Sequence, residues 1–491
     1  GWVMSFDIHI PDHWRWATIA EVQSSEKRST ITGPFGSSIG KKFFVEHGVP
    51  VIRGNNLSLD STKFKDEGFV FVSEDKAEEL RGYKAFKHDL IFTAAGTIGQ
   101  VGIIPDNTKY ECYIISNKQM RARFDTDKVD PMFAYYWFSS PWMVDYIKRH
   151  DTGSTIPLIN LGVLRSLPMP LPPVVEQVAI RQYLFMIDEK INNNNKINQT
   201  LEQMAQALFK SWFVDFEPVK AKMAVLEAGG SQAEATLAAM TAISAKGADA
   251  LTVFEREHPE QYAELKTTSE LFPSAMQDSE LGEIPEGWCV SNMKDNVDVR
   301  DGTHASPKAS DSGYHLVTSK NITSGYLDRR SCYYISDADY YEVNKRSRVS
   351  HGDILISMIG TVGALYFVAE KSVDYAIKNI GLIRTSERHD LQSFIFYYLK
   401  GKSGVDYINS RLAGTTQKYI SLKQLREIPL VIPTKDVLTA FNKKSFLHEI
   451  HANKEISETL ANIRDTLLPK LLSGEITLPE AEQAVSEAEN V

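Results

Sequence analysis

The stretch VVEQVAIRQYLFMIDEKINNNNKINQTLEQMAQALFKSWFV, residues 174–214, decides how this chain folds. It contains no glycine or proline, and it follows the proline-rich segment 168–173. Its apolar residues recur in alternating steps of four and three, which is the heptad pattern of a coiled-coil seam. We therefore predict one helix, about 60 Å long. The apolar seam positions are Ile180, Leu184, Ile187, Ile191, Leu201, Ala205, Leu208 and Trp212.

A second copy of this seam lies near the C-terminus, and the two copies share an Ile–Asn pair. Ile191 and Asn194 recur as Ile450 and Asn453. Asn192–Asn195 is either a solvated patch, or Asn194 and Asn453 occupy a shared seam and fix its register. We expect the two helices to form an antiparallel pair that acts as a spacer. The second seam reads Phe446, Ile450, Asn453, Ser457, Leu460, Leu467 and Leu471.

The segments that precede the two helices repeat each other at a spacing of about 260 residues. Such a repeat predicts two similar heads, each followed by its long helix. The matching pairs are 10–14 with 284–288, 88–92 with 352–356, 96–99 with 360–363, 135–136 with 397–398, and 153–168 with 414–429.

Each head reads as mixed α/β. Short β-rich runs are broken by Gly, Asn, Asp and Pro turns, and they do not alternate regularly with helices, which argues against a doubly wound parallel sheet. The fold class is therefore α+β, with a pseudo-twofold internal repeat. The β-rich runs are 49–52, 90–93, 101–104, 316–318, 354–357 and 365–368, and the helical patches are 132–148 and 391–408.

Five segments follow from this pattern. They are a first head (1–172), a central spacer helix (173–216), a helical acidic linker (217–283), a second head (284–433), and a C-terminal spacer helix with a tail (434–491). The linker is either a partly ordered connection or a surface for a partner subunit.

Composition is ordinary for a globular protein, with 43% apolar and 24% charged residues among 491. No apolar run has membrane-spanning length and no signal-peptide pattern opens the chain, so we expect a cytoplasmic protein without a membrane. The three cysteines form neither a disulfide framework nor a zinc motif. The net charge of −9 is uneven: residues 217–283 carry about −7 and residues 284–433 about +3. Charge alone neither supports nor excludes nucleic-acid binding.

Enzyme motifs are missing from the sequence. Gly33–Lys42 resembles a phosphate-binding loop, but its last two glycines are too close together and Lys42 replaces the required hydroxyl residue. The chain has no nucleophile elbow, no zinc-protease helix motif and no dinucleotide fingerprint. It also lacks the Asn/Asp-Pro-Pro-Tyr box of amino-directed DNA methyltransferases. We predict no catalytic residues, no metal ligands and no cofactor bound by this chain.

Both heads instead carry small, hydroxyl-bearing, amide and basic residues at corresponding turns. Small residues let backbone N–H groups approach phosphates, and Arg, Lys and Asn read base edges. The candidates in the first head are Gly33, Gly36, Ser37, Ser38, Lys41, Lys42, Arg53, Asn55, Asn56, Thr97, Asn117 and Lys118. Those in the second are Arg300, Thr303, His304, Lys308, Lys320, Asn321, Thr361, Lys378 and Asn379.

Several motifs resemble those of the specificity subunit of type I restriction–modification systems, and the resemblance covers nearly the whole chain except 217–270. The motifs are Gly33-Pro34-Phe35-Gly36-Ser37, Asp301-Gly302-Thr303-His304, Gly96-Thr97-Ile98-Gly99 with its twin at 360–363, Ser154-Thr155-Ile156-Pro157, and the runs 208–216 and 280–288.

The resemblance implies that each head is a target-recognition domain reading one half of a bipartite site in double-stranded DNA. It implies that the helices form the spacer and dock two methyltransferase (modification) subunits, with motor–nuclease (restriction) subunits joining to cut DNA. S-adenosylmethionine, ATP and Mg would then belong to the partner subunits. The candidate docking and spacer residues are Ile187, Ile191, Asn194, Leu201, Leu208, Trp212, Phe213, Ile450, Asn453, Leu460 and Leu467.

Two alternatives stay open. The heads could bind other proteins, which makes the chain a non-enzymatic scaffold, or the chain could hold an enzyme site that carries no recognisable motif. Trp212 and Phe213 likewise have two interpretations, as exposed docking aromatics or as ordinary core at a helix end.

Overall fold

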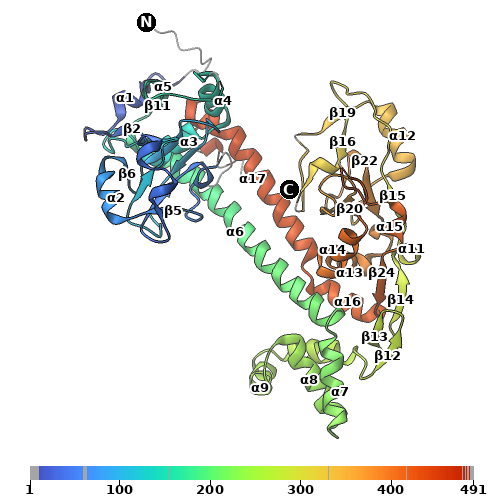
Figure 1. Cartoon of the computed structure of the whole chain (residues 1–491). Coiled ribbons are helices and arrows are strands. Elements are labelled where there is room, and N and C mark those ends of the chain that lie inside the picture. Colours follow the sequence, from blue (N-terminus) through green and yellow to red (C-terminus); the bar gives the residue numbers. More distant parts are fainter. Residues whose placement is uncertain are drawn as a thin grey trace. The chain divides into compact units, whose positions relative to one another are not determined.

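The computed structural model describes residues 10–58, 63–153, 155–323, 325–329, 331–415 and 417–477, with 479–481, 483 and 486 of the tail. Ser154 of the quoted motifs lies outside this range. The chain forms two compact units, residues 1–194 with 455–491 and residues 195–454. Each unit holds one head and a part of both long helices (Figure 1). The two units therefore meet at positions 194/195 and 454/455, inside the two predicted spacer segments 173–216 and 434–491 and not at their ends.

The central helix is confirmed. It is α6, Val174–Phe213, and it agrees with the predicted range to within one residue. The C-terminal helix is α17, Leu447–Ser473. In the first unit Asp188 of α6 bonds Arg464 of α17, and Asn194 bonds Ser457, so residue numbers rise along one helix as they fall along the other. The pair is antiparallel, as predicted.

One seam position of the second helix was wrong. Phe446 precedes α17 and has a left-handed backbone, with φ of 53°. Leu447 is the buried residue there, and Leu468 is more buried than the predicted Leu467. Periodicity locates a helix face, but it does not show where a backbone leaves the helical region.

The seam asparagines make contacts in both units. In the first, Asn194 Nδ2 donates to Ser457 Oγ over 3.3 Å. In the second, Asn198 Nδ2 donates to the Ile450 carbonyl over 2.9 Å, and Asn453 Nδ2 donates to Asn198 Oδ1 over 3.0 Å. Asn194 and Asn453 thus lie in the seam but pair with other partners, and Asn198 is the buried one.

The first head combines three small sheets with short helices. Its strands are Arg15–Thr18 (β1), Thr30–Thr32 (β2), Phe44–Val45 (β3), Val49–Ile52 (β4), Val70–Val72 (β5), Lys84–Ala85 (β6), Leu90–Thr93 (β7), Val101–Ile103 (β8), Tyr113–Ile115 (β9), Gln119–Ala122 (β10) and Pro168–Leu171 (β11). Its helices are Ile19–Val22 (α1), Glu74–Glu79 (α2), Pro131–Phe138 (α3), Pro141–Arg149 (α4) and Leu161–Ser166 (α5), with 3-10 turns Gly36–Ser38 (η1), Lys41–Phe43 (η2), Gly54–Asn56 (η3) and Arg81–Tyr83 (η4).

The second head has the corresponding elements. Its strands are Cys289–Asn292 (β14), Val299–Asp301 (β15), Tyr314–Thr318 (β16), Ile322–Thr323 (β17), Tyr326–Leu327 (β18), Tyr333–Ile335 (β19), Ile354–Ser357 (β20), Leu365–Phe367 (β21), Tyr375–Lys378 (β22), Ile380–Ile383 (β23) and Pro429–Ile432 (β24). Its helices are Met293–Asn296 (α11), Asp337–Ser347 (α12), Gln392–Lys400 (α13), Lys402–Ser410 (α14) and Leu422–Arg426 (α15), with 3-10 turns Ser319–Asn321 (η5), Thr385–Glu387 (η6) and His389–Leu391 (η7).

The two heads share the topology of their four-stranded sheet and of one two-stranded pair, whereas the remaining described strands form a five-stranded sheet in the first head and separate three- and two-stranded sheets in the second. The order β2-β10-β7-β8 in the first head returns as β15-β23-β20-β21 in the second, and the pair β1-β11 returns as β14-β24. Each head also contains a single parallel pairing among the described strands, β4 with β9 and β16 with β22. The remaining pairings are antiparallel. The α+β repeat predicted from the sequence is therefore confirmed.

Both predicted helical patches are split in two. Pro141 begins α4 after α3, and Gly401 separates α13 from α14. Proline at the first helical position and glycine after the last favour this break, because proline starts a helix and glycine ends one.

The acidic segment after α6 is helical, as predicted, and it is packed. It forms Glu217–Glu227 (α7), Gln232–Ser244 (α8), Ala248–Glu257 (α9) and Pro259–Glu270 (α10), followed by the hairpin Met276–Ser279 (β12) and Gly282–Pro285 (β13). Met240, Leu251 and Leu265 share a small core. The buried Lys222 donates to the Phe272 carbonyl over 2.6 Å.

The C-terminal spacer starts later than residue 434. Lys435–Lys444 forms a separate helix, α16, which packs against α13 of the second head, and the long helix begins only at Leu447. Among the described helices, α8 and α9 meet a membrane-span criterion only together, across an 85° bend, and no single helix meets it.

Candidate nucleic-acid interface

One glycine in each head brings distant loops together. The backbone N–H of Gly33 donates to the Gln119 carbonyl over 2.8 Å, and that of Gly302 donates to the Ile380 carbonyl over the same distance. A Cβ atom on Gly33 would overlap the carbonyl oxygen of Ser116, and one on Gly302 would overlap that of Ile377. These glycines are therefore required for the close approach of two loops, and the N–H of the candidate Gly33 is already bonded within the protein.

The loop after this glycine lies against the turn between β9 and β10 in the first head, and against the turn between β22 and β23 in the second. A Cβ on Gly36 would stand 3.2 Å from Asn117 Nδ2. In the second head Asn379 N donates to the Thr303 carbonyl over 3.2 Å, and Lys378 Nζ donates to Ser306 Oγ over 2.5 Å. The candidates Gly36 and Asn117 in the first head, and Thr303, Lys378 and Asn379 in the second, thus lie on one surface of their head.

Two further loops join the same surface. In the first head, the Ala94 N–H donates to the Lys118 carbonyl over 2.8 Å, and the Gly96 N–H donates to the Pro157 carbonyl over 2.9 Å. In the second head, the Gly360 N–H donates to the Lys418 carbonyl over 3.1 Å. The glycine turns of the internal repeat therefore hold the segments 155–158 and 417–419 beside the other loops.

One predicted base-reading asparagine in each head is buried. Asn56 accepts from the Arg53 N–H over 2.9 Å and donates to two carbonyls, and Asn321 accepts from the Thr318 N–H over 2.8 Å. Both side chains are buried. Asn56 and Asn321 hold their turns in shape, so their prediction as base-reading residues was wrong.

Arg300 is half-buried and bonded to its neighbours, and its role as a DNA contact stays a prediction. Its Nε donates to Asp298 Oδ2 over 2.7 Å and its Nη1 donates to the Arg346 carbonyl over 3.0 Å. Arg53 differs, because its Nε is buried without a hydrogen-bond partner among the described residues.

Most of the other candidates reach solvent on this surface. Ser38, Arg53, Thr303, Lys378 and Asn379 are half-buried. The exposed candidates are Gly36, Ser37, Lys41, Lys42, Asn55, Thr97, Asn117 and Lys118 in the first head, and His304, Lys308, Lys320 and Thr361 in the second.

His304 is held by its neighbours rather than projecting freely. Its Nε2 lies 2.9 Å from Asp301 Oδ2 and its Nδ1 lies 2.9 Å from Asn379 Oδ1. Asp301 is buried and also accepts from Arg346. A carboxylate that is shared by a guanidinium and an imidazole fixes the orientation of both groups.

Phe35 was missed by the sequence reasoning, although it stands within a quoted motif. Its side chain is 84% exposed, the largest exposed fraction among the large hydrophobic residues that the structure describes. The signal in the sequence is a phenylalanine in a loop of small residues, Gly33-Pro34-Phe35-Gly36-Ser37. The candidates were chosen for polar or charged side chains or for small size, and Phe35 has neither property.

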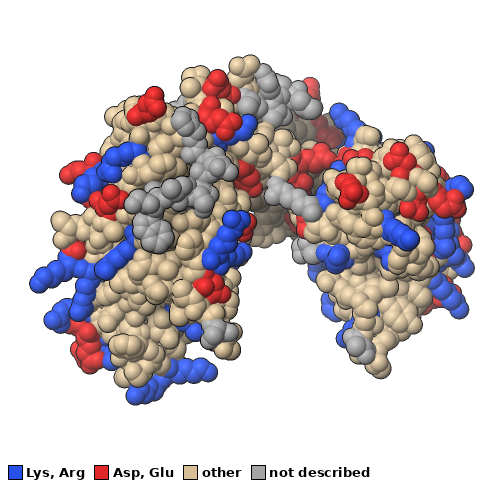
Figure 2. Space-filling model, turned by 90° about the horizontal axis from the view of Figure 1, so that it is seen from above, with Lys and Arg blue, Asp and Glu red and all other residues tan. Residues whose placement is uncertain are grey.

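Charge is mixed on the face of the molecule that Figure 2 shows. Figure 2 shows Lys and Arg side chains interspersed with Asp and Glu on the visible face of both parts of the molecule. Within the described residues, no group of three or more His, Cys, Asp or Glu side chains is arranged to hold a metal ion.

The predicted docking aromatics are core. Trp212 is fully buried and Phe213 nearly so, because both pack against Phe441 in the second unit. The interpretation of these two residues as exposed docking surface was wrong. The seam candidates Ile187, Ile191, Ile450 and Leu460 are buried, whereas Asn194, Leu201, Leu208, Asn453 and Leu467 are half-buried.

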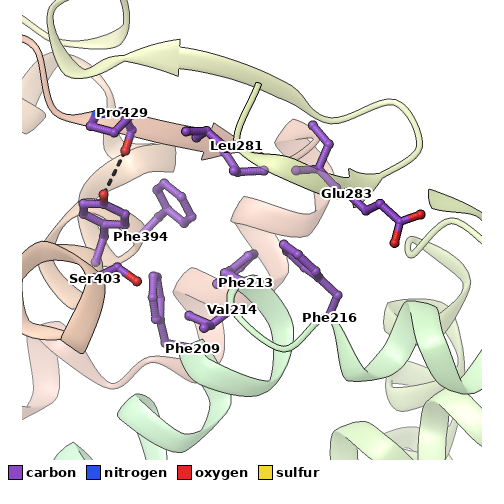
Figure 3. Close-up of a pocket in the computed structure, with 12 residues that line it drawn as sticks. Phe209, Phe213, Val214, Phe216, Leu281, Glu283, Phe394, Ser403 and Pro429 are labelled. Atoms are coloured by element: carbon purple, nitrogen blue, oxygen red, sulfur yellow. Dashed lines mark hydrogen bonds between the residues drawn. The ribbon is translucent and has the colours of Figure 1, made fainter. Parts of the chain in front are cut away.

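An open apolar pocket lies beside these aromatics, with a volume of about 300 Å³. Phe209, Phe213 and Val214 point into it from the end of α6, facing Phe394 of α13 and Leu281 of the β12–β13 turn (Figure 3). Tyr398 Oη donates to the Pro429 carbonyl over 2.8 Å at its edge.

Comparison with known proteins agrees with this architecture. The family model of the type I restriction modification DNA specificity domain matches the chain twice, over residues 27–203 and 285–471. Each match contains most of one head and most of the long helix that follows it; the first match begins after β1 and α1.

Related proteins carry the same designation. The chain is 30% identical over 393 residues to the type I restriction enzyme HindI specificity subunit of Haemophilus influenzae, covering 76% of this chain and 85% of that protein. It is 24% identical to the MjaIX specificity subunit of Methanocaldococcus jannaschii, covering 96% and 95%. The crystal structure of the type I S subunit from M. genitalium superposes with a TM-score of 0.50 at 15% identity, covering 95% of this chain and 97% of that one. This chain therefore belongs to the family of type I restriction–modification DNA specificity subunits.

Proposed function

We propose that each head of this specificity subunit reads one half of a bipartite target in double-stranded DNA. One observation carries the proposal: the two heads present different side chains on the same loop framework. The glycine-to-carbonyl bonds described above align Asn117 with Lys378 and Lys118 with Asn379. A shared framework with exchanged polar side chains is what two readers of two different sequences require.

The chemistry of the exposed side chains suits duplex DNA. Exposed lysines such as Lys41 and Lys118 supply charge to phosphates, while Asn117 and Asn55 carry amides that can pair with adenine edges. Several loops contribute to each surface, so one head can contact several consecutive base pairs.

Partner docking belongs to the outer side of α6. In the first unit Val175 and Met186 are 81% and 59% exposed, and in the second unit Ile197 and Met204 are 48% and 52% exposed. Val175 and Met186 are separated by 11 residues, and Ile197 and Met204 by 7, which are about three and two helical turns. Each part of α6 therefore leaves two exposed apolar side chains on one face outside the seam, and each such pair is called a stripe below.

We assign these stripes to two methyltransferase subunits, one on each part of α6. Apolar surface of this kind marks protein interfaces. Motor–nuclease subunits complete the complex, and S-adenosylmethionine, ATP and Mg act in the partner chains. The helices set the distance between the half-sites.

Selection of bound sequences tests the proposal directly. The full chain, with and without its methyltransferase subunits, is incubated with random-sequence duplexes, and the bound fraction is sequenced. We expect a two-part consensus with a fixed unread gap. Non-specific binding in the presence of the partners would contradict the proposal and favour the protein-binding scaffold.

Replacing residues 284–433 with the corresponding head of a relative separates the two readers. We expect one half of the consensus to change and the other to stay. A consensus that stays whole, or changes in both halves, would mean that the heads do not read independently.

Spacer length is tested by inserting four residues beside Asn198, which adds about one turn to α6. The tolerated gap between the half-sites should change. The matched control inserts four residues at Gly229-Gly230, between α7 and α8 and outside the helix pair. An unchanged gap in the Asn198 insertion would show that the helices do not set the spacing.

A further inference from the structure

The loop that follows Gly33 in the first head and Gly302 in the second carries a side chain with a ring in both heads. Phe35 is the second residue after Gly33, and His304 is the second residue after Gly302. Because the two glycines make equivalent backbone bonds, to Gln119 and Ile380, the two rings occupy equivalent places. One ring is wholly apolar and the other can donate and accept hydrogen bonds.

The backbone around Phe35 is fixed, so its exposure is not the result of a loose loop. The Ser38 N–H donates to the Phe35 carbonyl over 2.8 Å and begins η1. Pro34 on one side is buried, and Ile39 beyond η1 lies in the core formed by Val49, Val51 and Ile114. The chain thus anchors both ends of the loop and leaves the ring outside.

The surroundings of the ring match DNA better than they match a protein. Ser37, Lys41 and Lys42 follow Phe35 on the same loop and are all exposed, and the exposed Asn117 lies beside Gly36. Exposed lysines and hydroxyls on the loop that carries an apolar ring can contact the phosphates that flank a base. Apolar side chains on such loops contact thymine methyl groups or enter base steps.

We propose that Phe35 is a specificity-determining residue of the first head, and that its ring contacts the apolar surface of a base in the first half-site. The proposal rests on the proposed function, since it presupposes that the first head reads DNA. His304 takes the corresponding place in the second head, where Asp301 and Asn379 orient its ring. The two half-sites are therefore read by different chemistry at the same position.

The test uses the full chain assembled with its methyltransferase subunits and the duplex consensus selected by the wild-type complex. Phe35→Ala should weaken binding to this duplex by about tenfold or more, as expected for the loss of one base–aromatic contact. Binding to random duplexes and the slope of affinity with salt should stay unchanged, because no phosphate contact is lost. Selection with this variant should relax one position of the first half-site and leave the second half-site intact.

Phe86→Ala is the matched control. Phe86 is an exposed phenylalanine of the same head, 42% exposed, and it precedes β7, whereas the loop surface lies beyond the other end of that strand. It should bind the consensus like the wild type. Phe35→Leu, which keeps an apolar side chain, should retain part of the preference.

The ring could contact either a thymine methyl group or the face of a base at an opened base step, and modified duplexes distinguish these two contacts. If a thymine methyl is contacted, replacing that thymine by uracil weakens the wild type and leaves Phe35→Ala unaffected. If the ring enters a base step, 2-aminopurine at that step brightens with the wild type and not with the variant.

Equal binding of wild type and Phe35→Ala to the selected consensus would overturn the proposal, as would equal losses on consensus and random duplexes. Loss of the methyltransferase subunits from Phe35→Ala would show that the ring docks a protein and would overturn it too. If the wild-type complex selects no consensus, the proposed function fails instead, so the two failures are distinguishable.

Discussion

The first head meets the long helices through a buried carboxylate, whereas the second meets them through a buried imidazole. In the first unit Asp188 of α6 accepts from Lys63 over 2.7 Å, from Tyr136 over 2.6 Å and from Arg464 over 2.8 Å. In the second unit His451 of α17 lies among the rings of Phe367 and Phe396, and its Nε2 has no hydrogen-bond partner among the described residues.

The two heads therefore have similar folds but contact the long helices through side chains of different chemistry. The three donors compensate the charge of the buried carboxylate. Removing the carboxylate leaves buried positive charges without an opposite charge, which destabilises the fold. A buried imidazole among aromatic rings is stable only while it is neutral. The two junctions should therefore fail under different conditions, and each can be broken separately.

The largest effect is expected from Asp188→Ala. It leaves Lys63 and Arg464 without their shared carboxylate, with side chains only 13% and 14% exposed. Breaking a buried ion pair costs about 3–5 kcal/mol. Hydrogen exchange resolved by peptide in the full chain should show this loss in the first head and little change in the second.

Asp106→Ala is the control for this variant. Asp106 is 75% exposed and pairs with His88 on the surface, where ion pairs contribute little. Equal protection in the first head of Asp188→Ala and the wild type would show that the cluster does not fasten that head.

The next largest effect concerns Gly33 and Gly302, which hold together the loops of the proposed DNA-reading surface in each head. Gly33→Ala and Gly302→Ala each place a methyl group against a backbone carbonyl, so the two loops must separate. Such overpacking costs about 1–3 kcal/mol, which corresponds to roughly tenfold or more in binding. We expect each variant to lose its own half-site in the sequence-selection assay and to keep the other.

Gly96→Ala is the control for the steric clash, because a Cβ atom on Gly96 meets no atom within 4 Å. The φ of 97° at Gly96 strains any other residue, so this variant tests backbone strain without a clash. If Gly33→Ala impairs both half-sites equally, the loops of the two heads are not independent.

Acid should loosen the second head first. Burial lowers the pKa of His451 well below its ordinary value, and the nearby Lys454, Lys400 and His448 lower it further. In the unfolded chain this imidazole binds a proton near pH ~6.5, while the folded chain does not, so stability is complete above that pH and falls below it. Between pH 7.5 and 5.5 the second head should lose about 1 kcal/mol of protection against hydrogen exchange.

His451→Leu should remove most of this pH dependence, since leucine fills the same apolar site without a titrating group. Protection of the first head, whose Asp188 cluster contains no histidine, serves as the internal reference. A His451→Leu chain that retains the full acid sensitivity would assign it to other groups.

The sequence predicted what local periodicity determines. The strands 49–52, 90–93 and 354–357 and the helix from Val174 are placed to within a residue, because alternation and heptad spacing are local properties. The loops, in contrast, are brought together by contacts between residues far apart in the sequence. The hydrogen bond from Gly33 to Gln119 spans 86 positions, and no regular spacing in the sequence predicts it.

The same limit explains the errors at the site. Asn55 and Asn56 are neighbours of one residue type, yet Asn55 is exposed while Asn56 is buried and bonded to two carbonyls. Trp212 follows the seam pattern, and only the tertiary packing against Phe441 shows that it is core. Residue type suggests a chemistry, whereas burial decides whether it is available.

The smallest effect is a coupling energy between two asparagines in the polar layer of the helix pair in the second unit. Asn198→Ala removes the bonds to the Ile450 carbonyl and to Asn453, each of which contributes about 1 kcal/mol. Asn195→Ala, at an exposed position of the same helix, corrects for the higher helix propensity of alanine. A double-mutant cycle of Asn198→Ala with Asn453→Ala should give a coupling of about 0.5–1 kcal/mol in the exchange of α17 amides. Zero coupling would mean that the two amides are independently solvated, and register would then depend on the apolar seam alone.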